Sequence, residues 1–248
     1  MKAMILAAGR GTRLRPLTND RPKALVMAGG VPLLELAIRR LIHFGCRDII
    51  VNVHHFGEQI IEFLQEKDSF GINIQISDER EQLLDTGGAL KKAADFFADG
   101  QPFLLYNTDI ITDLHLADFY QQHCHLGALA TLAVRWRPTS RYLIFDAAGL
   151  LHGWVNVNTG SLKMARPTSG SLQLLAFGGL HVIDPRLFAY LSDKTVFSII
   201  DTYLEAAAHA DIRAQIHETG TWMDVGKPAN LEAAQPLAAQ LLAECRGI

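Results

Sequence analysis

The stretch LAAGRGTRLRPLTNDRPKAL, residues 6–25, decides how the rest of this chain is interpreted. It begins at the end of a short apolar run, residues 4–7, which is typical of a buried strand, and continues as a glycine-rich basic segment. Five cations lie within residues 9–23, where 23 Lys and Arg among 248 residues predict about 1.4. We therefore expect an anion site directly after the first strand. The cations are Arg10, Arg13, Arg15, Arg21 and Lys23.

Two glycines in this stretch favour binding of phosphate over a plain solvated loop. Gly9 and Gly11 let backbone N–H groups approach an anion, and they permit the positive φ angles that turn successive amides towards it. Two better-known phosphate loops do not fit: Leu14 breaks the three-glycine dinucleotide pattern, and no GK[ST] ending completes a P-loop. A solvated basic loop remains the alternative.

Outward from this stretch, apolar strands alternate with amphipathic helices. Such alternation is typical of βαβ units and predicts an α/β fold with a Rossmann-like, mixed, mostly parallel sheet flanked by helices. Ligands bind such sheets at the carboxyl ends of their strands. We expect helices over residues 33–44, 57–65 and 88–97, and strands over residues 48–53, 72–76 and 102–106.

After residue 126 the pattern changes to short apolar runs separated by Gly, Pro, Ser and Asn, which indicates a more antiparallel part. No repeat, low-complexity tract or linker interrupts the chain, so we expect a single domain, residues 1–248, with halves 1–126 and 127–248. The expected strands are residues 129–134, 142–145, 150–155 and 174–183, with a strand pair near 213–217 and 221–225. The expected helices are residues 185–191, 197–208 and 228–245.

Composition excludes several classes of protein. A hydrophobic fraction of 49% and a charged fraction of 20% fit a globular chain with a sizeable core. The net charge of -3 argues against a general nucleic-acid or anionic-membrane binder. No apolar run is long enough for a membrane span and no signal peptide is evident, so we expect a cytoplasmic protein. Its three cysteines show no CxxC spacing, which gives no sign of a zinc or redox site.

As a whole, residues 6–25 resemble the GxGTRLxPxTxxxPK signature of the sugar-1-phosphate nucleotidyltransferases. The resemblance implies that the partners are a nucleoside triphosphate and a sugar 1-phosphate, and that the products are a nucleotide sugar and pyrophosphate. It gives Arg13 and Lys23 a catalytic role in stabilising phosphate charge, and it places Ala8 beside the base. Gly9, Gly11 and Thr12 are expected to wrap the triphosphate.

A second motif, LDTGGAL at residues 84–90, is similar to the family's LGTAGAL-type turn. The resemblance implies that Gly87 and Gly88 bring the backbone close to the nucleobase and sugar. A plain helix N-terminus capped by Asp85 or Thr86 is an alternative that can hold at the same time. Just upstream, Glu79 and Gln82 are candidate base or ribose contacts.

Two aspartates complete the predicted site. Asp109 ends the sequence Asn107, Thr108, Asp109 after an apolar strand, where the family shows a glycine in place of Thr108 and a metal-binding aspartate. Asp224 lies in TWMDVGKP, which resembles the family's WxDVGTP motif. Magnesium prefers hard oxygen ligands and commonly takes one or two carboxylates plus phosphates and waters. We expect Mg²⁺ on Asp109 and Asp224, with Asn107 contacting substrate.

The sugar-phosphate site follows the family pattern less closely. Relatives carry an EKP-like lysine shortly before a strand that corresponds here to Gly178 and its neighbours. This chain has Lys163 further upstream and Arg166 instead. We expect Lys163 and Gly178 to contact the sugar phosphate, with Arg166 as the alternative to the lysine. In this interpretation residues 1–126 bind the nucleotide and residues 127–248 bind the sugar phosphate.

Within the family, the run from VNVHHFGEQI to DTGGAL is most similar to uridylyltransferases that act on N-acetylmuramate 1-phosphate, with a role in cell-wall recycling. Mannose-1-phosphate guanylyltransferases are similar as well. No acyltransferase extension follows the last expected helix, so a single activity is expected. Two other classes are alternatives. One is a nucleotide-sugar-dependent glycosyltransferase, which would carry a DxD motif at the position of residues 107–109, where this chain has Asn, Thr and Asp. The other is a catalytically silent regulator, against which the presence of Arg13, Lys23 and both aspartates argues. Oligomeric state cannot be read from the sequence.

Overall fold

The computed structural model describes residues 1–167 and 170–245 of the chain. These divide into two compact units, each assembled from segments far apart in sequence. The predicted halves follow sequence order instead, and the single-domain organisation stays a prediction. Unit 1 comprises Met1–Leu83, Leu105–Ala117 and Gly220–Ile248, and unit 2 comprises Leu84–Leu104 and Asp118–Thr219.

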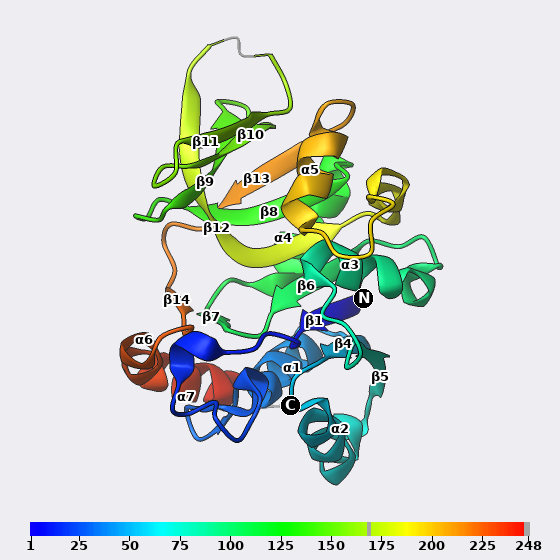
Figure 1. The fold of residues 1–248 in the computed structure, drawn as a ribbon, viewed down its shortest axis with the longest axis vertical. Helices are drawn as coiled ribbons and strands as arrows, with labels where there is room; N and C mark the ends of the chain where they lie inside the picture. The colour runs from blue at the N-terminus through cyan, green and yellow to red at the C-terminus, as the bar shows by residue number, and fades with distance from the viewer. Residues whose placement is uncertain (168–169, 246–248) are drawn as a thin grey trace. The chain divides into compact units, whose positions relative to one another are not determined.

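A parallel sheet organises unit 1 (Figure 1). Its strands are β1 (Lys2–Leu6), β4 (Asp48–Val53), β5 (Asn73–Asp78) and the end of β6 (Phe103–Asn107) from Leu105 onward, in the order β6–β1–β4–β5. The β1–β4 and β4–β5 pairings are parallel. β1 and β4 are almost entirely apolar and buried, as expected of strands covered on both faces. Parallel pairing brings the carboxyl ends of these strands to one edge, where residues 6–9 and 52–54 lie.

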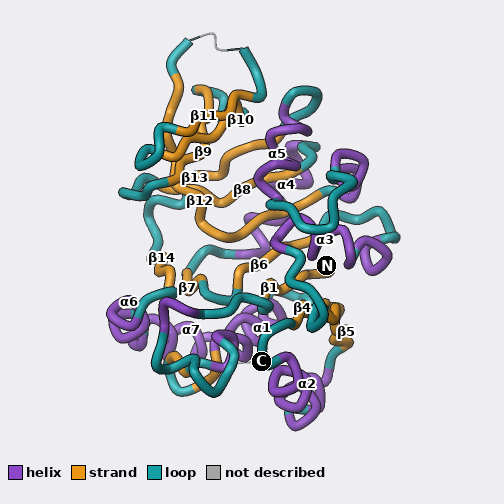
Figure 2. Tube along the Cα trace, viewed as in Figure 1, coloured by secondary structure: helices purple, strands orange, loops and turns teal. Residues whose placement is uncertain are grey.

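Four helices accompany this sheet: α1 (Leu33–His43), α2 (Gly57–Glu66), α6 (Pro228–Ala233) and α7 (Gln235–Cys245). Figure 2 shows α6 and α7 as separate purple segments, which corrects the single helix expected over residues 228–245. The break has a physical cause, because Pro236 lacks the N–H that a continuous helix would need and clashes with the preceding turn. The Gln235 side chain then accepts the Gly29 amide at 2.8 Å.

Small elements complete unit 1. The pair β2 (Met27–Ala28) and β3 (Val31–Pro32) precedes α1, and β7 (Ile110–Thr112) pairs antiparallel with β14 (Trp222–Asp224). That second pairing connects the segment after β6 with the C-terminal segment of the chain. Short 3-10 turns lie at Thr12–Leu14, Lys23–Leu25 and Asp68–Gly71.

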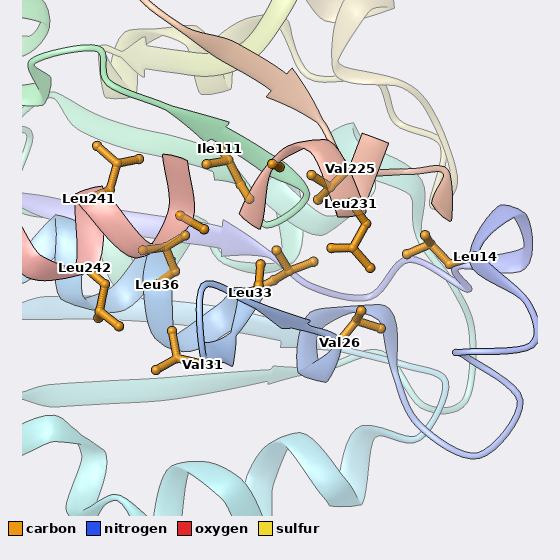
Figure 3. Packing of buried hydrophobic residues seen from close by; sticks show 13 residues of the cluster. Leu14, Val26, Val31, Leu33, Leu36, Ile111, Val225, Leu231, Leu241 and Leu242 are labelled. Atoms are coloured by element: carbon orange, nitrogen blue, oxygen red, sulfur yellow. The ribbon is translucent and has the colours of Figure 1, made fainter. Parts of the chain in front are cut away.

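A hydrophobic cluster holds the segments of unit 1 that carry the predicted site (Figure 3). Leu14 from the basic loop, Ile111 from β7 and Val225 after β14 are all buried in it. Each of these residues is within two positions of a predicted functional residue: Arg13, Asp109 or Asp224. Burial of apolar side chains therefore fixes the backbone from which the charged side chains project. The other members come from residues 26–36 and from α6 and α7.

Unit 2 contains mostly antiparallel strands in the order β11–β10–β9–β12. The strand β12 also pairs antiparallel with β8, off this path, and β8 pairs parallel with β13. The strands are β8 (Ala130–Arg135), β9 (Arg141–Asp146), β10 (Leu151–Asn156), β11 (Ser161–Met164), β12 (Leu172–Ile183) and β13 (Ile212–Ile216). The helical segments are α3 (Asp85–Lys92), α4 (Leu116–Leu126), α5 (Ile199–Ala207) and 3-10 turns at Ala94–Phe97 and Pro185–Tyr190.

The predicted fold class, an α/β fold with a mixed, mostly parallel sheet flanked by helices, is confirmed. Three details differ from expectation. The helix α4 and the strands β7 and β11 were not predicted, the helix expected over residues 88–97 begins at Asp85 and becomes a 3-10 turn, and β13 and β14 pair with β8 and β7 instead of with each other. No helix in the described ranges has the length and apolarity to cross a membrane.

Candidate active site

The basic loop after β1 is shaped around Gly11. Its φ of 63° lies in the left-handed region, as predicted, and Thr18 Oγ1 donates to its carbonyl at 2.9 Å. A Cβ at Gly11 would lie 2.9 Å from Lys23 Cβ, so the site needs glycine for space as well as for conformation. Gly9 differs from expectation, because it does not have a positive φ and a Cβ there would meet nothing within 4 Å.

Three arginines of the loop carry uncompensated charge. Arg10, Arg13 and Arg15 are exposed, and within residues 1–167 and 170–245 no hydrogen bond or ion pair engages their guanidinium groups. By contrast, Arg21 pairs with Asp20 at 3.1 Å, which holds the pKa of that carboxyl below its usual range. Local positive charge without a protein partner is what an anionic ligand requires.

The exit of the chain from β1 is held from both neighbouring strands. On the β6 side, Thr108 Oγ1 donates to the Leu6 carbonyl at 2.6 Å. On the β4 side, Asn52 Oδ1 accepts the amide N–H groups of Ala7 at 2.7 Å and Ala8 at 3.3 Å. Thr108 stands where the family motif has glycine. Its hydroxyl, which a glycine would lack, helps to fix the start of the loop by bonding to the Leu6 carbonyl. Asn52 was missed by sequence reasoning, although a polar residue inside the apolar run IIVNV is a recognisable signal.

Lys23 and Asp109 meet directly. The Lys23 ammonium donates to Asp109 Oδ2 in a partly buried ion pair. Asp109 lies in the turn between β6 and β7, and the buried Tyr106 hydroxyl fixes this turn by donating to the Ile110 carbonyl at 3.0 Å. Burial raises the pKa of Tyr106, so its hydroxyl stays protonated and able to donate.

The β7–β14 pairing brings the second aspartate to the first. Asp224 is opposite Ile110 in the register, and the Val225 amide donates to the Asp109 carbonyl at 3.0 Å. A Cβ at Gly226 would lie 2.7 Å from Asp224 Oδ1 and 2.8 Å from Arg13 Nη2. Arg13 and Asp224 therefore both approach Gly226. Unit 1 thus gathers four predicted residues, namely Arg13, Lys23, Asp109 and Asp224.

The donor set fits a hard divalent cation. Asp109 directly precedes β7 and Asp224 is the last residue of its partner strand β14, so both supply carboxylate oxygens at this strand pair. Mg²⁺ commonly takes one or two carboxylates and completes its coordination shell with phosphates and waters. No group of three or more His, Cys, Asp or Glu side chains that could hold a metal is found in the ranges described. At the end of β6, Asn107 Oδ1 is buried and lacks a hydrogen-bond partner among the described residues. An orphaned buried acceptor of this kind is unusual and suits a site that a ligand completes.

Glu79 and Gln82, predicted to contact base or ribose, have different surroundings. Glu79 is only 2% exposed, and its Oε1 accepts Asn52 Nδ2 at 2.8 Å. Gln82 is exposed, and its backbone amide donates to the Glu79 carbonyl at 3.0 Å. His54 Nδ1 contacts the same carbonyl at 2.7 Å. A carbonyl only accepts, so the proton of a neutral His54 is on Nδ1. The nucleotide contacts of Glu79 and Gln82 stay predictions.

In unit 2, Gly87 and Gly88 have a packing requirement. A Cβ at Gly87 would lie 2.4 Å from the Phe197 ring, and one at Gly88 would lie 2.2 Å from the Thr195 carbonyl oxygen. Both amides donate to the Phe197 carbonyl, at 2.9 and 3.3 Å. Asp85 accepts the N–H of the very next residue, so the expected side-chain cap of the helix is replaced by this carbonyl. The nucleotide role of the two glycines stays a prediction.

The two candidates for the sugar phosphate differ in how they are engaged. Lys163 on β11 is exposed, lies 5.7 Å from the Trp154 ring and pairs with Asp201 on α5 at 2.7 Å. Arg166 donates to the carbonyls of Ala207 and Ala210, and so satisfies backbone acceptors and partial negative charge at the C-terminal end of α5. Arg166 is therefore the less available of the two.

Gly178 lies in a bulge of β12, where the register against β8 shifts between Phe177 and His181. A Cβ at Gly178 would lie 2.8 Å from the Ala133 carbonyl oxygen, so close packing of β12 on β8 requires glycine there. Its predicted contact with the sugar phosphate stays a prediction.

Comparison with known sequences gives the family. The nucleotidyl transferase family model matches residues 2–240. N-acetylmuramate alpha-1-phosphate uridylyltransferase of Caulobacter vibrioides is 32% identical over 246 residues, covering 96% of this chain and 97% of that protein. Mannose-1-phosphate guanyltransferase of Yarrowia lipolytica is 31% identical over 234 residues, covering 92% of this chain and 61% of that protein.

Solved structures agree on the fold. HddC from Yersinia pseudotuberculosis superposes with a TM-score of 0.76 at 20% identity, covering 95% of this chain and 98% of that one. At this identity the likeness concerns the fold alone, and it agrees with the predicted Rossmann-like α/β fold. The family match over nearly the whole chain, together with relatives above 30% identity, shows that this chain belongs to the nucleotidyl transferase family and is a sugar-1-phosphate nucleotidyltransferase.

Proposed function

We propose that this enzyme transfers a uridylyl group from UTP to N-acetylmuramate 1-phosphate, giving the nucleotide sugar and pyrophosphate, with Mg²⁺ as its cofactor. The observation that carries the proposal is that the unpaired Arg13 and the Asp224 carboxylate both approach Gly226, next to the segment that holds the Lys23–Asp109 pair. The choice of substrates is supported by the similarity to the Caulobacter vibrioides uridylyltransferase. A role in cell-wall recycling and a cytoplasmic location follow as predictions.

In this proposal the reaction is an in-line displacement at the α-phosphorus. An oxygen of the sugar phosphate is already ionised, so the site needs no general base to activate it. The Arg13 guanidinium and the Lys23 ammonium steady the negative charge of the departing pyrophosphate. Lys23 can do this while it remains paired with Asp109, because an ammonium group has three donors.

The two aspartates would hold Mg²⁺, which when bound neutralises phosphate charge and orients the reacting groups. The chain itself supplies position. Leu14, Ile111 and Val225 anchor the charged residues in the hydrophobic cluster of unit 1, so two anionic substrates can be held together at little cost in reorganisation. For the sugar phosphate, Lys163 is the favoured contact, because its pair with Asp201 is exposed, whereas Arg166 is held by two backbone carbonyls and partly buried.

The test is pyrophosphate release with Mg²⁺, with UTP, GTP, CTP, ATP and dTTP each combined with N-acetylmuramate 1-phosphate, mannose 1-phosphate and glucose 1-phosphate. The proposal requires that UTP with N-acetylmuramate 1-phosphate gives the highest kcat/KM. A higher value for GTP with mannose 1-phosphate would establish the second candidate, which the similarity to the Yarrowia lipolytica enzyme favours.

A further inference from the structure

One row of side chains crosses the carboxyl edge of the unit 1 sheet. In the parallel register, Leu6 on β1 is opposite Asn52 on β4, and Asn52 is opposite Ser77 on β5. Asn52 is 3% exposed, and its Oδ1 receives two backbone amides, those of Ala7 and Ala8. These amides follow the last residue of β1, so the Asn52 oxygen satisfies donors at the point where the strand ends and the loop begins.

The orientation of the Asn52 amide is set by Glu79. Glu79 Oε1 lies 2.8 Å from Asn52 Nδ2, and a carboxylate can only accept, so the NH₂ group must face Glu79. The oxygen of Asn52 is then left to face Ala7 and Ala8. Glu79 is itself fixed through its backbone, because its amide donates to the Val53 carbonyl at 2.8 Å.

We propose that Asn52 is a positioning residue for the nucleotide-binding loop, and that Glu79 acts on this loop through Asn52. For the ligand, this inference rests on the proposed function. The chain of hydrogen bonds from Glu79 through Asn52 to Ala7 and Ala8 fixes the direction in which the backbone leaves β1 towards Arg13. A loop released from Asn52 must lose more conformational freedom when it binds nucleotide, so affinity falls.

Exchange of carboxylate and amide between the two positions tests this chain of hydrogen bonds. Asn52→Asp places two carboxylates against each other and removes the donor to Glu79. Glu79→Gln alone keeps an acceptor for Asn52 Nδ2. The double variant, Asn52→Asp with Glu79→Gln, restores the pairing in reverse. The amide introduced at position 79 can donate to the new carboxylate at position 52, whose other oxygen still accepts Ala7 and Ala8.

The matched control is Ser77→Ala. Ser77 is in the same row as Asn52, is buried, and its hydroxyl has no partner among the described residues. Removal of this hydroxyl changes the same edge of the sheet without breaking a hydrogen bond. Its affinity for nucleotide is expected to match that of the unaltered protein.

Three measurements decide the matter. Titration calorimetry with UTP should show roughly tenfold weaker binding for Asn52→Asp, a change within about threefold for Glu79→Gln, and recovery to that level in the double variant. In turnover, KM for UTP should rise more than kcat falls. Hydrogen exchange of the peptide that contains Ala7 and Ala8 should be faster in Asn52→Asp and slower again in the double variant.

Unchanged UTP affinity and unchanged exchange in Asn52→Asp would overturn the proposal. Loss of affinity that the double variant does not recover would remove Glu79 from it. If the unaltered protein binds no UTP, the titration is repeated with the triphosphate that supports turnover. If the unaltered protein binds no nucleoside triphosphate at all, the proposed function is wrong. The exchange measurement then still decides whether Asn52 holds the loop.

Discussion

Gly226 in unit 1 and the glycines of the LDTGGAL motif in unit 2 serve different purposes. In unit 1, a Cβ at Gly226 would meet the ends of two side chains of the candidate site, Asp224 and Arg13. In unit 2, a Cβ at Gly88 would meet the Thr195 carbonyl oxygen, and one at Gly87 would meet the Phe197 ring. A motif glycine is thus required by the site in the first case and by the fold in the second.

Cations show the same contrast. The Arg13 guanidinium in unit 1 makes no ion pair or hydrogen bond with the part of the chain that the structure describes, whereas Lys163 and Arg166 in unit 2 are engaged by Asp201 and by α5. The difference teaches that a basic residue in a family motif indicates a ligand site most strongly where the protein itself leaves the charge uncompensated.

The largest expected effect comes from removal of either aspartate of unit 1. If Asp109 and Asp224 hold Mg²⁺ as proposed, Asp109→Ala or Asp224→Ala should lower magnesium-dependent turnover by roughly a thousandfold or more, because the cation would lose one of its two carboxylate ligands. Pyrophosphate release over a range of Mg²⁺ concentrations measures the loss, with circular dichroism to verify the fold. Asp193→Ala, an exposed aspartate of unit 2, is the control. Full activity in either site variant would remove that aspartate from the metal site.

Gly88→Ala tests the packing role in unit 2. The new Cβ would lie 2.2 Å from a backbone oxygen that cannot move alone, so the free energy of unfolding should fall by about 3 kcal/mol. Urea unfolding measures the change. A variant as stable as the unaltered protein would show that residues 195–197 can move away from the new Cβ at little cost. Gly88 would then not be required by the packing of unit 2, and the comparison with Gly226 would fail.

Gly226→Ala is the counterpart in unit 1. The atoms in its way are the ends of the Asp224 and Arg13 side chains and not backbone, but Asp224 Oδ1 also accepts the Gly226 amide at 2.7 Å, so the free energy of unfolding should fall by about 1 kcal/mol. The displaced groups belong to the site, so kcat/KM should fall roughly tenfold to a hundredfold. Kinetics and urea unfolding of the same preparation separate the two effects. Gly9→Ala provides a useful control for stability, since nothing lies within 4 Å of its Cβ position.

Much of this arrangement could be predicted from sequence because it depends on local patterns. Short stretches of sequence are enough to show the passage from β1 into the basic loop, the aspartate after β6 and the alternation of strands with helices. The helix α4 carried a readable signal too, since Leu116, Phe119 and His123 are buried at helical spacing. Its polar residues obscured that signal.

Pairings between distant segments were harder to predict. Nothing in residues 213–225 shows that β13 pairs with β8 whereas β14 pairs with β7, yet the second pairing is what brings Asp224 to Asp109. Asn52 was missed for a similar reason, because its partners are 44, 45 and 27 positions away in the chain. Strand partners are chosen by tertiary packing, which a single sequence does not display.

A further expected effect concerns pH and again separates the units. The two histidines with strongly depressed pKa values both lie in unit 2: burial lowers the pKa of His181 to about 3 and that of His123 to about 4. His181 Nδ1 lies 2.5 Å from the Tyr203 hydroxyl, and His123 Nδ1 lies 2.9 Å from Thr131 Oγ1, so both are neutral members of a packed core.

The sign of the pH effect follows from these shifts. Each histidine has a lower pKa in the folded state than its ordinary value of 6.5, so below pH 6.5 the unfolded state binds more protons and the free energy of unfolding falls. The loss is at most about 1.4 kcal/mol per pH unit for each histidine. Urea unfolding between about pH 7 and pH 5 measures it, above the range in which carboxylates ordinarily titrate. His181→Gln should show about half the slope of the unaltered protein, whereas an unchanged slope would assign the acid sensitivity to groups other than the buried histidine.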